Sequence, residues 1–129
     1  MPSFIGIDHV ALTVSNLAVS VPFYSRLWDT KPVATMNDGP FSRQIFALPG
    51  GITLGLTQHD HGSGNPFEPK TPGLDHLGFK VENRAELEAW AQLLDDQDIR
   101  HSGLVEAPYG TALSFKDPDG IALEFFLGA

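Results

Sequence analysis

The chain has 129 residues, of which 42% are hydrophobic and 19% are charged, as in one soluble globular domain. Its net charge of −8 argues against nucleic acid as a partner, because phosphate binding requires clustered basic side chains. The chain contains no cysteine, which excludes disulfides and thiolate metal sites, and no apolar run approaches the length of a membrane span. We therefore expect a cytoplasmic protein with one domain over residues 1–129 that binds neither nucleic acid nor membrane.

Nearly the same nine residues occur twice, as "GIDHVALTV" at 6–14 and "GLDHLGFKV" at 73–81. In both copies apolar residues alternate with small or polar ones, which predicts strands at 7–14 and 74–81. His9 and His76 are expected on the faces that carry the small residues. The repeat predicts a duplicated module, and its histidine indicates a functional site.

A helix is expected after each of these strands. In the first copy we expect it to begin near Ser20, because Pro22 is poorly tolerated deep in a helix. Three strands at 33–37, 41–48 and 52–57 should follow, separated by "NDGP" and "LPGG" turns. Residues 58–72 are rich in Gly, Pro and polar residues, which is typical of a connecting loop.

The second copy shows a clearer helix. Asn83 is expected to cap it, Glu86 occupies the capping-box position, and Leu87, Trp90 and Leu94 form an apolar stripe. Strands are expected at 100–106, 111–116 and 121–127. The order βαβββ, repeated over about 4–57 and 73–129, predicts an α+β fold. We expect two tandem modules that form a cupped, mostly antiparallel sheet with the helices outside.

Glu124 lies between apolar neighbours, where a carboxylate is costly unless it is paired or binds a cation. Aligning the copies places Gly55 at the position of Glu124. If the modules pack about a pseudo-twofold axis, His9, His76 and Glu124 converge, and Gly55 leaves an opening at the fourth corner for water or a substrate oxygen. Two imidazoles and a carboxylate suit divalent Fe, Mn, Ni or Zn and leave coordination positions free. The alternative is a vestigial site.

The paired "DH" strands, the "FYSRLW" helix end and the C-terminal "DPDGIALEFF" resemble the vicinal oxygen chelate superfamily. That superfamily includes glyoxalase I, fosfomycin-resistance proteins, extradiol dioxygenases and bleomycin-resistance proteins. The resemblance covers nearly the whole chain. It implies that His9, His76 and Glu124 are metal ligands and that the protein is a homodimer. Gly55 departs from the four-ligand pattern of glyoxalase I-like sites, because glycine cannot be a side-chain ligand.

Three further residues are candidates for the pocket. Tyr109 is either a catalytic proton donor to a metal-bound substrate or a packed aromatic; Lys80 either faces a negative substrate or reaches solvent; Phe126 either lines the pocket or fills the core. The convergent set His9, His76 and Glu124, together with the resemblance, predicts a divalent-metal-dependent enzyme of isomerase/lyase or dioxygenase type, with Glu124 and Tyr109 as its catalytic residues. The resemblance implies a substrate that is a small molecule chelating the metal through adjacent oxygens. The alternative is a metal-free small-molecule binding or drug-sequestration protein of the bleomycin-resistance type.

Overall fold

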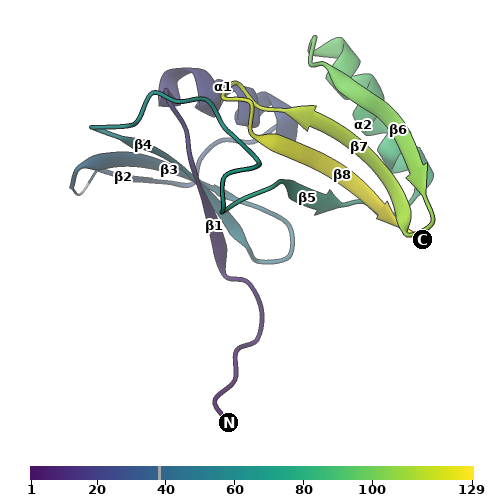
Figure 1. Cartoon of the computed structure of the whole chain (residues 1–129), viewed down its shortest axis with the longest axis horizontal. Helices are drawn as coiled ribbons and strands as arrows, with labels where there is room; N and C mark the ends of the chain where they lie inside the picture. The colour runs from purple at the N-terminus through teal and green to yellow at the C-terminus, as the bar shows by residue number, and fades with distance from the viewer. Residues whose placement is uncertain (38) are drawn as a thin grey trace. The chain divides into compact units, whose positions relative to one another are not determined.

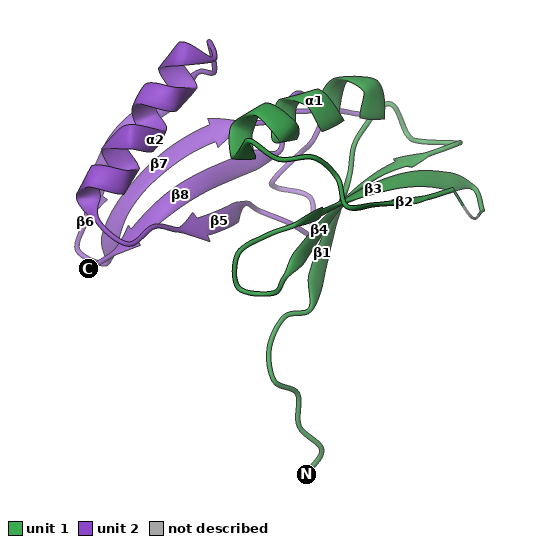
Figure 2. Ribbon diagram, turned by 180° about the vertical axis from the view of Figure 1, so that it is seen from behind, with its two compact units in different colours: residues 1–64 green, residues 65–129 purple. Residues whose placement is uncertain are grey.

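The computed structural model describes residues 1–37 and 39–129 and contains two compact units, residues 1–64 and 65–129 (Figure 2). Each unit has one strand, one helix and three strands in chain order, so the α+β fold with two tandem βαβββ modules is confirmed (Figure 1). The boundary between the units lies within the expected loop 58–72. Asp38, in the expected "NDGP" turn, lies outside the described residues. Within those residues, neither helix is long and apolar enough to cross a membrane.

Unit 1 is a four-stranded sheet with one helix. Its elements are β1 (His9–Thr13), α1 (Leu17–Trp28), β2 (Ala34–Met36), β3 (Phe41–Ala47) and β4 (Thr53–His59). The strand order is β1-β4-β3-β2, and β1 and β4 are parallel while the other pairs are antiparallel. Helix α1 packs on β3 and β4, where the rings of Trp28 and Phe46 meet at 5.6 Å between centroids. The opposite face of this sheet carries His9.

Several of the expected boundaries in unit 1 are wrong, among them the start of β1, which is His9 rather than residue 7. Helix α1 begins at Leu17 rather than near Ser20, because Asn16 caps it by accepting a 3.0 Å hydrogen bond from the amide of Ala18. Pro22 therefore lies inside the helix, where it removes one backbone hydrogen bond. Burial of the helix face that packs on the sheet outweighs this local loss. Strand β4 runs on to His59, so the loop begins two residues later than expected.

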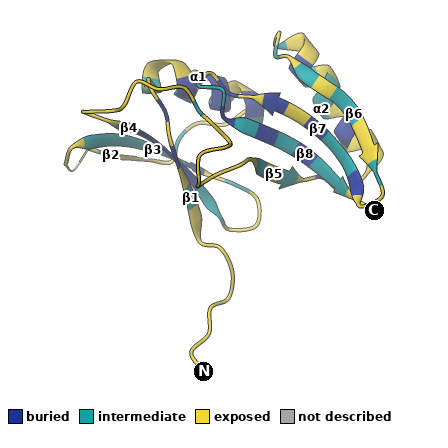
Figure 3. Ribbon diagram, in the orientation of Figure 1, coloured by how far each residue is buried: buried dark blue, intermediate teal, exposed yellow. Residues whose placement is uncertain are grey.

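Unit 2 repeats this architecture. Its elements are β5 (Leu77–Lys80), α2 (Arg84–Asp96), β6 (His101–Ala107), β7 (Gly110–Lys116) and β8 (Ala122–Gly128). The strand order is β5-β8-β7-β6, with β5 and β8 parallel. Burial alternates along β7 and β8, as expected for strands with one core-facing side (Figure 3). On that side Trp90 of α2 stacks on Phe125 with ring centroids 4.0 Å apart.

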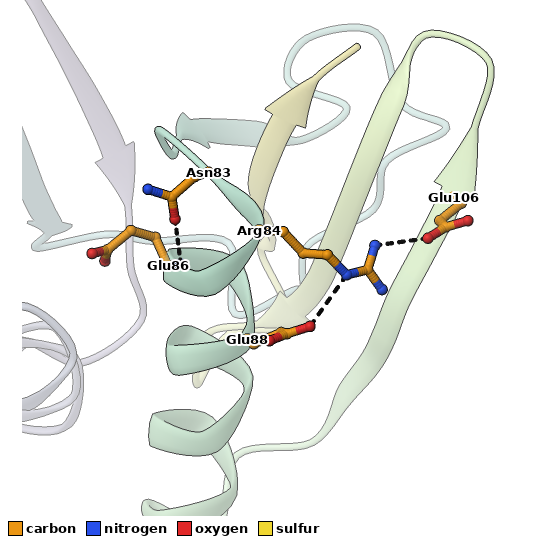
Figure 4. A network of polar contacts seen from close by, with 5 residues as sticks. All are labelled: Asn83, Arg84, Glu86, Glu88 and Glu106. Atoms are coloured by element: carbon orange, nitrogen blue, oxygen red, sulfur yellow. Dashed lines mark hydrogen bonds and ion pairs between the residues drawn. The ribbon is translucent and has the colours of Figure 1, made fainter.

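Helix α2 begins as the sequence predicts. The side chain of Asn83 accepts a 2.9 Å hydrogen bond from the amide of Glu86 (Figure 4). Next to it, Arg84 donates to Glu88 at 3.2 Å and to Glu106 of β6 at 2.7 Å. Because these charged side chains are exposed, the ion pairs add little stability, but they fix the start of the helix beside β6.

Candidate metal centre

His76 and Glu124 lie on the same face of the sheet in unit 2. Strand β8 runs between β5 and β7, so Glu124 pairs with Gly78 on one side and with Ser114 on the other. His76 lies two residues before Gly78 and therefore faces the same side. Its Nε2 lies 3.6 Å from Oε1 of Glu124, whose side chain is only 20% exposed. The structure thus brings these two predicted ligands together.

The other ring nitrogen of His76 is occupied by its sequence neighbour. Nδ1 lies 2.6 Å from Oδ1 of Asp75, so Nδ1–H donates to this carboxylate and the Nε2 lone pair is directed toward Glu124. The hydrogen bond to Asp75 raises the pKa of His76 above its ordinary value of 6.5; burial opposes this rise, and the charges of Glu124 and Asp75 add to it. Metal-bound histidines are oriented by such a carboxylate on their second nitrogen.

This donor pair fits a divalent metal. At 3.6 Å, the Nε2 to Oε1 separation is too long for a hydrogen bond, so both donor atoms keep their lone pairs. Two ligands of one tetrahedral ion, each about 2.1 Å from it, lie about 3.4 Å apart, which is close to the observed spacing. Gly78 makes this position of Glu124 possible, because a Cβ atom at residue 78 would lie 3.3 Å from Oε1 and 3.4 Å from Cγ of the glutamate.

Unit 1 contains the same histidine arrangement. Nδ1 of His9 lies 2.7 Å from Oδ1 of Asp8, and the ring is exposed on the face opposite α1. Two residues further on, Ala11 pairs with Gly55, as Gly78 pairs with Glu124 in unit 2. The strand register therefore confirms the alignment of Gly55 with Glu124. Among the described side chains, no three of His, Asp and Glu lie close enough together to hold one metal ion, so the three-ligand set stays a prediction.

The expectation of an opening at Gly55 is wrong. Gly55 is buried, and the side chain of Arg43 lies over it: a Cβ atom at residue 55 would be 3.1 Å from Cδ and 3.5 Å from Cγ of the arginine. The physical reason lies in the strand register. Arg43 of β3 pairs with Thr57 of β4, two residues after Gly55, and the long side chain of Arg43 extends from there over the glycine. Sequence alternation gave no sign of this cross-strand contact.

The other predicted pocket residues lie further along the sheet in unit 2. Lys80 is exposed and pairs with Phe126, on the same face as Glu124. Phe126 is half-buried and stacks on Tyr109 with ring centroids 6.3 Å apart. Tyr109 is 74% exposed and directly precedes Gly110, the first residue of β7. Gly110 lies four residue pairs along the strand from Ser114, which pairs with Glu124, so Gly110 and Ser114 are about 13 Å apart. The structure does not bring Tyr109 beside Glu124 within this unit.

A hollow of about 580 Å³ opens in unit 2 beside Glu124. Its polar lining consists of His76, Arg100, His101, Ser114, Lys116 and Glu124. Neither Arg100 nor Lys116 forms an ion pair with any residue that the structure describes. His101 is a structural residue, since Nε2 lies 2.7 Å from Asp95 and Nδ1 accepts from the amide of Gly103. The alternation of β7 could have indicated Lys116, which lies on the face of Ser114.

The chain thus combines two βαβββ modules, each with an Asp-His pair next to or at the start of its first strand, and in unit 2 a carboxylate faces that histidine. Residues 6–125 match the family model described as the Glyoxalase/Bleomycin resistance protein/Dioxygenase superfamily, and the chain belongs to this superfamily.

Three relatives illustrate the likeness. A glyoxylase/bleomycin resistance protein/dioxygenase domain from Frankia sp. EAN1pec is 36% identical, with a TM-score of 0.91, over 98% of this chain and 100% of that one. A trivalent organoarsenical cleaving enzyme from Bacillus sp. strain MD1 is 31% identical over 92% of this chain and 70% of its own length. A metallothiol transferase, FosB, from Bacillus licheniformis is 26% identical over 97% of this chain and 77% of its own length.

Proposed function

We propose that the protein is a divalent-metal-dependent enzyme that acts on a small molecule, which chelates the metal through adjacent oxygens. The proposal rests on the Asp75–His76–Glu124 arrangement, in which one ring nitrogen is held by a carboxylate and the other faces a second carboxylate at 3.6 Å. A carboxylate on one ring nitrogen orients the other, as is usual for metal-bound histidines. Fe, Mn, Ni and Zn are the candidate ions, because imidazole and carboxylate suit all four.

His9 is the third ligand in this proposal. Its ring is held by Asp8 as that of His76 is held by Asp75, and the two histidines occupy equivalent positions in the two modules. His9 completes the site either within one chain or from the second chain of a homodimer. In both arrangements the two Asp side chains keep the Nδ1 protons in place, and the Nε2 atoms and Glu124 bind the ion.

The bound ion would supply Lewis-acid stabilisation of negative charge developing on the substrate oxygens. The protein residues orient the donor atoms and line the pocket, to which we assign Lys80, Phe126 and the hollow beside Glu124. Two of the relatives are named as a trivalent organoarsenical cleaving enzyme and a metallothiol transferase, so members of the superfamily differ in their chemistry. For this chain we propose isomerase or lyase chemistry or dioxygenation. Glu124 is the proposed catalytic side chain beside the ion. Tyr109 lies four residue pairs along the sheet from Glu124 in unit 2, so we propose it as a proton donor only from a second chain.

Metal content tests the proposal. Protein purified without chelators, or dialysed against Mn(II), should contain one metal ion per chain by elemental analysis. His9→Ala and Glu124→Gln should each lose it, whereas His61→Ala, which removes a histidine outside the predicted site, should keep it. Stoichiometric metal that survives both substitutions would overturn the assignment.

The hollow in unit 2 favours a second candidate, a metal-free protein that binds or sequesters a small molecule. It has room for a drug-sized ligand and carries two cations without ion-pair partners among the described residues. Thermal unfolding separates the candidates, because a ligand that binds the native state raises the transition temperature. A rise with Mn(II), Ni(II), Zn(II) or Fe(II) supports the enzyme. A rise with bleomycin-like compounds and none with metals supports sequestration.

A further inference from the structure

Arg43 of β3 is held in place by three contacts within unit 1. Its Nε donates a 2.7 Å hydrogen bond to Oγ1 of Thr57, which is only 2% exposed. Its guanidinium lies over the ring of Phe41, 4.7 Å from the centroid. Its methylene groups lie against Gly55. A side chain fixed along its length loses little further conformational freedom when it binds a ligand.

The guanidinium of Arg43 has no counter-charge among the residues that the structure describes. No carboxylate among the described residues forms an ion pair with it, although acidic residues outnumber basic ones two to one in this chain. Nε is bound to Thr57, and the two terminal nitrogens form no hydrogen bond with any residue in the described part of the chain. They have the fork geometry that matches the two oxygens of a carboxylate or phosphonate. A half-buried cation of this kind gains stability when an anion pairs with it.

The internal repeat shows what Gly55 contributes. At the equivalent position unit 2 has Glu124, a predicted metal ligand, whereas unit 1 has a glycine covered by arginine. The glycine leaves the space that the side chain of Arg43 occupies. At this equivalent position unit 2 therefore carries a carboxylate, and unit 1 carries a guanidinium.

We infer that Arg43 is an anion-binding residue of unit 1, and that it binds an oxyanion group, either a carboxylate or a phosphonate, of a small molecule. Thr57 is a positioning residue that holds Nε, and Gly55 is required for the path of the arginine side chain. The binding of an anion by Arg43 does not depend on the proposed metal site, and it can be measured on metal-free protein.

The test uses chelator-treated protein, with acetate as a planar probe and methylphosphonate as a tetrahedral one. Binding is followed through the Nε–H resonance of Arg43 by NMR, and affinity is measured by titration. At least one probe should shift that resonance. Arg43→Gln should weaken binding by about tenfold or more, since it removes the charge and the fork of donors. Gly55→Ala should weaken it similarly, because the new Cβ displaces the side chain of Arg43.

Three further variants make the result decisive. Arg43→Lys keeps the charge and should retain partial affinity. Lys31→Gln removes an exposed cation of the same unit and should bind as wild type does. Wild-type affinity in Arg43→Gln, or a loss in Lys116→Gln instead, would overturn the inference and place the anion in the hollow of unit 2. Mn(II) binding by Arg43→Gln should match that of the wild type, so failure of the metal site would be seen separately.

Discussion

Gly55 and Glu124 occupy the same place in two sheets of the same topology. Gly55 pairs with the residue two positions after His9, and Glu124 pairs with the residue two positions after His76. The two modules thus share a strand arrangement and a histidine, but they differ in charge at this equivalent position. Unit 2 has the carboxylate of Glu124, and unit 1 has the guanidinium side chain of Arg43 lying over Gly55. This asymmetry underlies the predictions that follow.

Gly78→Ala should weaken metal binding without unfolding the protein. The added Cβ would lie 3.3 Å from Oε1 of Glu124 and push this carboxylate away from His76. We expect metal affinity to fall by about tenfold, as for other changes that misplace a ligand. The free energy of unfolding should change by less than about 1 kcal/mol.

Isothermal titration with Mn(II) and chemical denaturation measure these two quantities. Gly128→Ala is the matched control, because it adds the same methyl group on β8 with nothing within 4 Å. If the two alanine variants bind metal equally well, the position of Glu124 beside Gly78 does not matter for the site.

Gly55→Glu places in unit 1 the residue that unit 2 uses. With Arg43 present, the new carboxylate should pair with the guanidinium, so metal affinity should change little. In the Arg43→Ala background the same carboxylate is free to act as a fourth ligand, and metal affinity should rise. A double-mutant cycle of Mn(II) affinities measures this coupling. Additive effects of the two substitutions on Mn(II) affinity would show that the side chains at positions 43 and 55 do not interact.

His76 should titrate above its ordinary pKa of 6.5 in metal-free protein, mainly because of the hydrogen bond to Asp75. Asp75→Asn should lower this pKa, and Glu124→Gln should lower it less, because the charge of Glu124 is a smaller cause. The raised pKa stabilises the fold below pH 6.5, and this contribution is lost as the pH rises through the raised value. NMR titration of the ring protons checks both substitutions. An unchanged pKa in Asp75→Asn would contradict the assigned hydrogen bond.

Asn83→Ala should destabilise the protein by about 1 kcal/mol, since it removes the acceptor for the amide of Glu86 at the start of α2. Asn83→Ser keeps a capping oxygen and should recover most of the loss. Urea denaturation gives both values. Equal losses in the two variants would mean that the cap is not the source of the effect.

The repeat made much of the fold predictable from sequence. Alternation around His9 and His76 identified the existence of the first strands, and Asn83 identified the start of α2, because these signals are local. The strand expected at 74–81 is shorter in the structure, Leu77–Lys80, and begins after His76. The start of α1 was missed because Pro22 carried more weight than the cap at Asn16, whereas in the fold packing overrides the cost of the proline. Boundaries fixed by tertiary contacts are not encoded in a short window.

The candidate site was predictable only in part. The equivalence of the Gly55 and Glu124 positions followed from the alignment of the two repeats, because a repeat preserves strand register. The position of Arg43 over Gly55 did not follow, since it depends on which strands are neighbours and on the path of a long side chain. The role of Asp75 was also missed, although the repeated Asp-His pair was its signal.

The most direct test of the account is a crystal structure of the protein grown with Mn(II), with anomalous diffraction data collected above the manganese absorption edge. We predict one anomalous peak per chain, bound by Nε2 of His76, the carboxylate of Glu124 and Nε2 of a His9 from the same chain or a second copy. A peak bound without His9, or at ligands away from the His76–Glu124 pair, would contradict the proposed site.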